Sequence, residues 1–76
     1  MSSKAKISIV IEKDSYGYFA FCPELKGCHS QGNTLEEAVA NIKEAAELYL
    51  ETLSEDELQD VVSQEIFTTA VEVQCV

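Results

Sequence analysis

Four signals of local structure follow one another without a gap in residues 18–50, and their order restricts the fold more than any other feature. Residues 18–22 are all apolar, with Tyr18, Ala20 and Cys22 on one face of a strand and Phe19 and Phe21 on the other. Pro23 removes a ladder donor and Gly27 permits a tight reversal, so the chain turns between them. A short polar strand over residues 28–31 leads directly into a helix. We expect an antiparallel sheet with that helix packed against it.

The start of this helix is marked by Thr34 and Glu37, which stand three residues apart as in a capping box. The threonine oxygen can accept from the backbone N–H of Glu37, and the glutamate side chain can reach back to the N-cap. Apolar side chains then recur at helical spacing and predict the face that packs on the sheet. They are Leu35, Ala38, Val39, Ile42, Ala45, Ala46, Tyr49 and Leu53.

The flanking segments predict three further elements. Isoleucines at positions 7, 9 and 11 alternate with Ser8, Val10 and Glu12, which predicts a first strand that pairs with the second. Ser54 and Glu57 repeat the capping-box spacing and predict a short second helix over residues 55–62. Alternation at Val71, Val73 and Cys75 predicts a final strand. We therefore predict one α+β domain over residues 1–76, with a three-stranded antiparallel meander, two helices and a last strand.

The charge balance limits the partners of this domain. Fourteen acidic residues stand against five basic ones in 76 residues, for a formal net charge of -9. Such a field repels phosphate backbones and attracts basic proteins, so we expect no direct binding to nucleic acid. No apolar run is long enough for a signal peptide or a membrane span, and three cysteines are an odd count for a disulfide framework. We expect a cytoplasmic protein.

Three spaced motifs give the chain a resemblance to the HicB family of antitoxins. They are PELKG at residues 23–27, GNTLEEA at 32–38 and NIKEA at 41–45. The resemblance implies a HicB-like domain whose meander and helix form part of a ribonuclease H-like fold. It also implies a partner, a small basic HicA-type toxin that cleaves mRNA, which the antitoxin neutralises by covering its catalytic surface.

Many members of that family carry a further DNA-binding domain that represses their own operon. These 76 residues contain no segment that resembles one, so repression by the chain is an open question. A stand-alone oligomeric interaction module without a toxin partner is the alternative function.

One helix can cover only one face of the sheet, and both faces of the second strand are apolar. If the helix covers Tyr18, Ala20 and Cys22, then Phe19 and Phe21 lie uncovered, and such a patch is typical of an interface. In the alternative register the two faces are exchanged. We expect the uncovered face to bind the partner or to form a homo-oligomer, a dimer or tetramer. The candidate interface residues are Val10, Glu12, Phe19, Phe21, Glu24, His29 and Gln31.

Chemistry at the cysteines or carboxylates is a weaker hypothesis. Cys28 and His29 are adjacent, but neighbours in a strand point to opposite faces and cannot share a proton. Zinc binding would need these two residues with Cys22 and Cys75, whose spacing does not fit the usual pattern. A metal-dependent nuclease would rest on Glu12, Asp14 and Glu24 near strand ends. We expect no catalytic residues, no bound metal and no cofactor.

Overall fold

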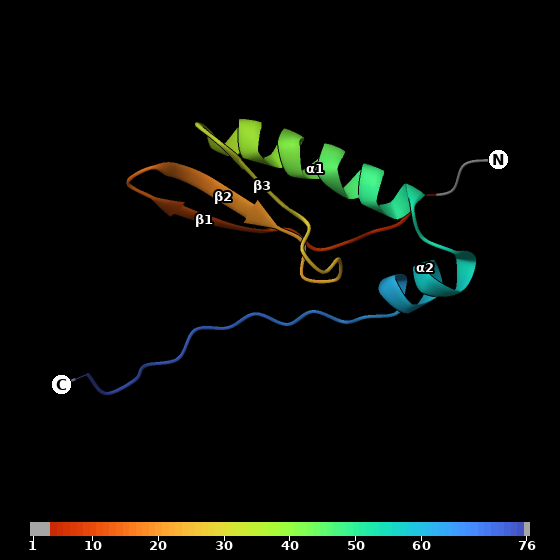
Figure 1. Ribbon diagram of the computed structural model, residues 1–76. Helices are drawn as coiled ribbons and strands as arrows, with labels where there is room; N and C mark the ends of the chain where they lie inside the picture. The colour runs from red at the N-terminus through yellow and green to blue at the C-terminus, as the bar shows by residue number, and fades with distance from the viewer. Residues whose placement is uncertain (1–3, 76) are drawn as a thin grey trace.

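The computed structural model describes residues 4–75, which form a three-stranded sheet, a long helix on one of its faces and a short second helix. Figure 1 shows α1 (Leu35–Glu51) lying along the sheet, and α2 (Glu55–Val62) beyond one end of it. The predicted α+β class, the antiparallel meander and the two helices are confirmed. No helix among the described residues is long and apolar enough to cross a membrane. The elements are β1 (Val10–Asp14), β2 (Gly17–Phe21), β3 (His29–Gly32), α1 (Leu35–Glu51) and α2 (Glu55–Val62).

A tight hairpin joins β1 to β2 and sets their register. Asp14 is paired with Gly17, which leaves two residues in the turn. The Asp14 carboxylate accepts a hydrogen bond from the backbone N–H of Tyr16 at 2.8 Å, the local bond that makes aspartate a turn residue. Gly17 has a φ of 134°, which a side chain would disfavour. This register places Val10 opposite Phe21, with Glu12 opposite Phe19.

The first strand is shorter than predicted, because β1 begins at Val10 and the preceding isoleucines lie outside the ladder. Its partner β2 ends at Phe21, and Pro23 then turns the chain away, so the residues before Val10 have no strand to pair with. The N–H of Ser8 instead donates to the Glu24 carboxylate at 2.9 Å. Ile7 and Ile9 still pack against the core from this extended segment.

The turn between β2 and β3 also contributes to the core. The backbone N–H of Leu25 donates to the Cys22 carbonyl, and the N–H of Cys28 donates to the Leu25 carbonyl. Gly27 has a φ of 78°, in the left-handed region that favours glycine. These bonds fold the Leu25 side chain inward until it is almost fully buried.

Small residues let α1 approach the sheet closely. Ala20 on β2 and Ala38 on α1 are fully buried. The larger Ile42 on α1 is also fully buried. At Gly32 an added Cβ would lie only 2.6 Å from the backbone nitrogen of Ala38, so even a methyl group would push strand and helix apart. The face of β2 that carries Ala20 is therefore the covered face, as the sequence predicts.

Both helices begin at their predicted caps. The Thr34 hydroxyl accepts from the N–H of Glu37 at 3.1 Å, while the Glu37 carboxylate accepts from the N–H of Asn33, one residue before the cap. In α2 the capping box of Ser54 and Glu57 is complete. Not all of the predicted apolar stripe is buried, since Leu35 is 47% exposed and Val39 is 44% exposed.

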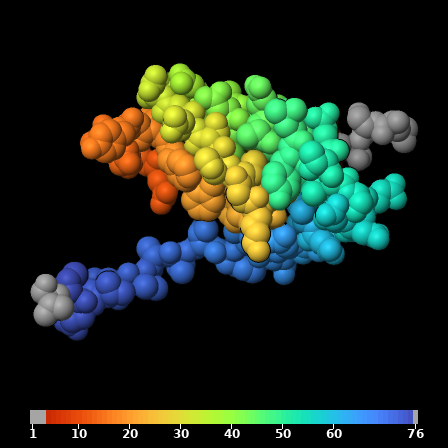
Figure 2. Space-filling view, viewed as in Figure 1, coloured from red at the N-terminus to blue at the C-terminus, as the bar shows by residue number. Residues whose placement is uncertain are grey.

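The final strand predicted from Val71, Val73 and Cys75 is not formed within residues 4–75. The tail, which we define as residues 64–75, contains no helix or strand, and almost all of its side chains are exposed. It projects away from the body of the molecule in Figures 1 and 2. The alternating residues are present in the tail, but in the single chain they meet no sheet edge with which they could form a ladder.

Candidate functional site

The face of the sheet opposite α1 is uncovered and carries a compact group of mainly aromatic and polar side chains. Two rows run across the strands, because directly paired residues point to the same face. One row joins Val10, Phe21 and His29, and the other joins Glu12, Phe19 and Gln31. We call this surface the aromatic face. It brings together six of the seven interface residues that the sequence predicts.

Ring contacts hold the centre of the aromatic face in place. The rings of Phe19 and Phe21 lie 6.2 Å apart between centroids and are tilted by 36°. The imidazole of His29 stacks against Phe19 at 5.6 Å with an interplanar angle of 29°. Both separations lie in the range where aromatic pairs attract each other beyond the area that they bury. The rings therefore form an ordered apolar platform.

This platform remains open to solvent. Phe19 is 39% exposed and His29 is exposed as well, whereas Phe21 is partly buried. Single exposed apolar residues are common on soluble proteins, but a contiguous group rimmed by polar side chains is typical of a binding surface. Glu12, His29 and Gln31 supply that polar rim.

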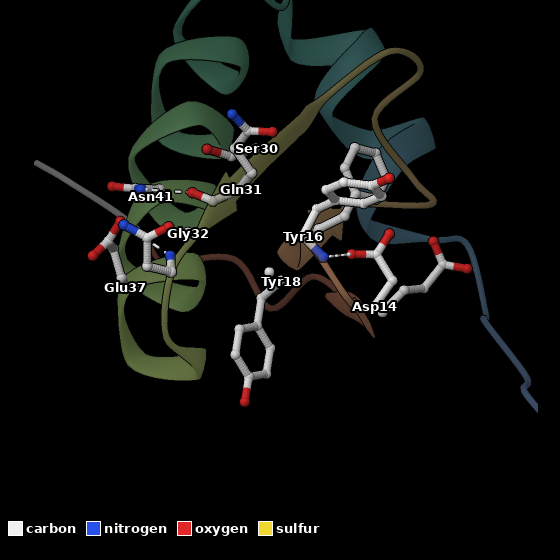
Figure 3. A pocket seen from close by; sticks show the side chains of 12 residues that line it. Asp14, Tyr16, Tyr18, Ser30, Gln31, Gly32, Glu37 and Asn41 are labelled. Carbon is white, nitrogen blue, oxygen red and sulfur yellow. Dashed lines mark hydrogen bonds between the residues drawn. The ribbon is translucent and has the colours of Figure 1, made fainter.

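A polar hollow adjoins the aromatic face at the hairpin end of the sheet, as Figure 3 shows. Asp14 and Tyr16 enter it from the hairpin, whereas Glu37 and Asn41 enter it from α1. The Asn41 amide donates to the backbone carbonyl of Gln31 at 2.8 Å and ties the helix to the edge of β3. We call this site the acidic hollow.

The lining of the acidic hollow includes three carboxylates and no lysine or arginine. These carboxylates belong to Glu12, Asp14 and Glu37. Tyr16 is 93% exposed and offers a phenol at the rim. Glu12, Phe19 and Gln31 belong to both the hollow and the aromatic face, so the two form one continuous surface. Such a surface can accept a partner that presents lysine or arginine beside apolar groups.

Glu24, the seventh predicted interface residue, lies apart from this surface. Its side chain is buried, with the carboxylate accepting from the Ser8 N–H at 2.9 Å and from the Cys22 thiol at 3.6 Å. These bonds tie the segment before β1 to the turn after β2. The carboxylate is committed to the fold, so we leave it out of the candidate binding surface.

The cysteines do not form a reactive or metal-binding group. Cys28 is buried in the core while His29 is exposed on the aromatic face, as strand alternation predicts. Burial raises the pKa of Cys22 to about 11 and also raises the pKa of Cys28, so both thiols stay protonated near neutral pH. Cys75 lies in the exposed tail. Within residues 4–75, no three histidine, cysteine or acidic side chains converge to hold a metal ion.

The helix carboxylates are also dispersed rather than convergent. Glu36, Glu44 and Glu51 all lie on the solvent side of α1 and are exposed. Glu12 and Asp14 lie near one another in the hollow, but Glu24 is buried near the opposite end of β1. The set of strand-end acids that a nuclease would require is therefore not assembled.

The sequence of the chain matches one protein family over most of its length. A family described as HicB-like antitoxin of bacterial toxin-antitoxin systems matches residues 7–73, which is most of the chain. The chain belongs to this family. The predicted HicB-like identity is confirmed, and membership supports an antitoxin role that is not enzymatic.

Relatives with similar sequences come from distant organisms. A UPF0150 protein of Helicobacter pylori is 67% identical over 52 residues, which cover 68% of this chain and 72% of the relative. A UPF0150 protein of Synechocystis is 62% identical over 47 residues, which cover 60% of each chain. One from Archaeoglobus fulgidus is 53% identical over 47 residues, or 60% of this chain and 68% of the relative. No solved structure matches this HicB-like chain.

Proposed function

We propose that this HicB-like chain neutralises a small basic HicA-type toxin by binding it through the aromatic face and the acidic hollow. Contact at this surface would occlude the catalytic surface of the toxin and stop its cleavage of mRNA. The observation that carries the proposal is the uncovered Phe19, Phe21 and His29 platform, which is continuous with a hollow that holds three carboxylates and no basic side chain. Family membership supports a toxin partner in general.

The two parts of the surface have different roles in this proposal. Burial of the phenylalanine rings excludes water at the centre of the contact and slows dissociation. The carboxylates of Glu12, Asp14 and Glu37 pair with cationic groups near the rim and orient the encounter. The toxin occupies the aromatic face in this arrangement, so the homo-oligomer expected from the sequence must form through another surface.

Growth rescue on co-expression tests the proposal directly. The wild-type chain should restore growth to cells that express a basic HicA-like neighbour, and in vitro it should inhibit RNA cleavage. Replacing both Phe19 and Phe21 with serine should abolish rescue and speed dissociation of the complex. Leu48→Ser is the matched control, because Leu48 is an exposed apolar residue on the outer side of α1. Failure of rescue against every such neighbour, with both proteins soluble, would leave the proposal without support.

The net charge of -9 should act mainly on the rate of association. Charge reversal at Glu44, Glu47 and Glu51 to lysine should slow association with the basic toxin, by less than about tenfold at low salt. Because salt screens this long-range attraction, the difference from wild type should shrink as ionic strength rises. Stopped-flow kinetics would measure both rate constants. A change confined to dissociation would place these glutamates in the contact itself.

A further inference from the structure

Two unpaired apolar surfaces of this chain complement each other. The first is a groove between the extended segment before β1 and the flank of α1. Ile7 and Ile9 line it from the segment, and Val39 and Leu50 line it from the helix. The second surface is the tail, residues 64–75. We call the first the flank groove.

The flank groove lies beside an open sheet edge. Since β1 pairs only with β2, its other side is free to accept a strand. Within the described residues, the backbones of Ile7 and Ile9 form no hydrogen bond to another backbone group. The other edge is less accessible, because the Asn41 side chain already occupies the Gln31 carbonyl of β3. The β1 edge is therefore the better acceptor.

The tail has the sequence and conformation of a strand that lacks a neighbour. Phe67, Val71 and Val73 stand at odd-numbered positions, which share one side of an extended strand. These three side chains are between 73% and 85% exposed. The radius of gyration is 14.6 Å, whereas a compact domain of this length has a value of about 11 Å. The tail thus stays off the body of its own chain, with its apolar side uncovered (Figure 2).

Charge also matches between the two surfaces. Lys6 and Lys43 line the groove together with Glu47, so two of the five basic residues of an acidic chain gather there. The tail carries Glu65 and Glu72 and has no basic residue. Two copies of a chain with net charge -9 repel each other in general. A contact between this tail and this groove brings opposite charges together.

We propose that the tail of one copy pairs as an added strand with the β1 edge of a second copy. Phe67, Val71 and Val73 enter the flank groove of that copy, and reciprocal exchange of the two tails makes a symmetric dimer. In Figure 1 the tail leaves α2 on the side of the sheet away from α1. The groove of the same chain is lined by residues of α1, so a second copy is the favoured acceptor. Because the contact is at the β1 edge, the aromatic face remains free for a toxin.

Sedimentation of the 76-residue chain tests the tail. Wild type should be a dimer, and changing both Val71 and Val73 to aspartate should raise the dimer dissociation constant by about 100-fold or more. Thr68→Asp with Ala70→Asp is the matched control, since it adds the same charge on the other side of the strand and should weaken the dimer much less. A monomeric wild type, or a tail variant that dimerises like wild type, would overturn the proposal.

Mixing two defective variants distinguishes exchange of tails between copies from other modes of dimerisation. Val39→Asp damages the groove and should also dissociate the dimer, while its helical circular dichroism stays close to wild type. When it is mixed with the Val71 and Val73 variant, one intact tail can enter one intact groove, so dimers should partly return. No recovery on mixing, with both variants folded, would exclude exchange between copies.

Hydrogen exchange locates the added strand. Alternate amides of residues 66–74 should be protected in wild type and should lose that protection in both variants. A tail that is protected in a monomer would mean that it folds onto its own chain. A tail that exchanges like a free peptide in a dimer would mean that copies associate elsewhere. Either result contradicts the proposal, and neither depends on the toxin.

Discussion

The two faces of the sheet come from the same three strands, yet they distribute side-chain size and burial in opposite ways. On the covered face Ala20 is completely buried beneath α1, whereas on the aromatic face the much larger Phe19 is 39% exposed. Stability of the isolated chain alone would favour the reverse, because burying phenylalanine removes more apolar area from water. The difference indicates that close approach of the helix decides the covered face, and it agrees with the proposal that the aromatic face contacts another molecule.

Close approach has a specific structural basis. Strand and helix backbones come so near at Gly32 that a single added carbon would clash with Ala38. Interiors are packed to the density of organic crystals, so such a contact cannot adjust without moving a whole element. The aromatic face has no comparable constraint. Substitutions on the two faces should therefore have different costs and affect different properties.

The largest effect on stability is expected where α1 packs against the covered face. Ile42→Ala should lower the free energy of unfolding by about 2–5 kcal/mol, because it removes buried methyl groups and leaves a cavity. This is a large share of the total for a small domain, which is about 5–15 kcal/mol. Urea denaturation followed by circular dichroism would measure it. A loss below about 1 kcal/mol would show that the core collapses around the gap and that packing under α1 is loose.

The next effect tests the close approach itself. Gly32→Ala should cost about 1–3 kcal/mol, since its Cβ would lie 2.6 Å from the Ala38 nitrogen and 2.9 Å from the Glu37 carbonyl carbon. Gly27→Ala is a useful comparison. Gly27 has open space around it but a φ of 78°, so any loss of stability in this variant would come from backbone strain alone. Chemical denaturation would compare the two. If Gly32→Ala were neutral, strand and helix would be free to separate, and the small residues would need another explanation.

Sequence reasoning succeeded where one local pattern decided the outcome. The bounds of α2 follow from the spacing of Ser54 and Glu57, and the start of α1 follows from Thr34. Six residues of the aromatic face followed from strand alternation once the helix was assigned to the Ala20 side. These features depend on neighbours in the chain, so no knowledge of distant contacts was needed.

Features that depend on convergence of distant segments were missed. Glu24 looked like a surface carboxylate, and its burial follows only from the position of the Ser8 N–H, sixteen residues away. The acidic hollow combines the hairpin residue Asp14 with Glu37 of α1, which are far apart in sequence. The sequence signals for that hollow were the two acidic residues near the strand ends, Glu12 and Asp14, and they gave no indication that Glu37 lies beside them. The alternating pattern of the tail was recognised in the sequence. The sequence could not show that the tail finds no partner strand in its own chain.

A smaller effect on stability is expected on the aromatic face. Phe19→Ser should lower the free energy of unfolding by about 1 kcal/mol, because the ring is already partly exposed and mainly loses its contacts with Phe21 and His29. The same denaturation measurement should thus separate it clearly from Ile42→Ala. A loss as large as that of Ile42→Ala would mean that the aromatic platform is part of the core, and the contrast between the two faces would not hold.

The effect that is smallest at neutral pH concerns the buried Cys22 thiol, because it appears only when this thiol ionises at high pH. Burial raises the pKa of Cys22 from 9.0 to about 11, so in the pH range between these values the thiol ionises in the unfolded chain but stays protonated in the folded one. Ionisation then favours the unfolded state: the stability contributed by the protonated thiol is complete below pH 9 and is lost as pH rises towards 11. Thermal unfolding from pH 8 to 11 should therefore show a steeper fall for wild type than for Cys22→Ala.

Cys75→Ala is the control for that comparison, because its thiol is exposed in the tail and its removal should leave the slope of wild type unchanged. The remaining titratable groups are common to all three proteins, so their contributions cancel in the difference. A lower stability of Cys22→Ala at pH 8 is expected from the lost packing and does not affect the slope. Equal slopes for wild type and Cys22→Ala would show that water reaches the thiol, and that the covered face is less tightly sealed by α1 than its buried alanines indicate.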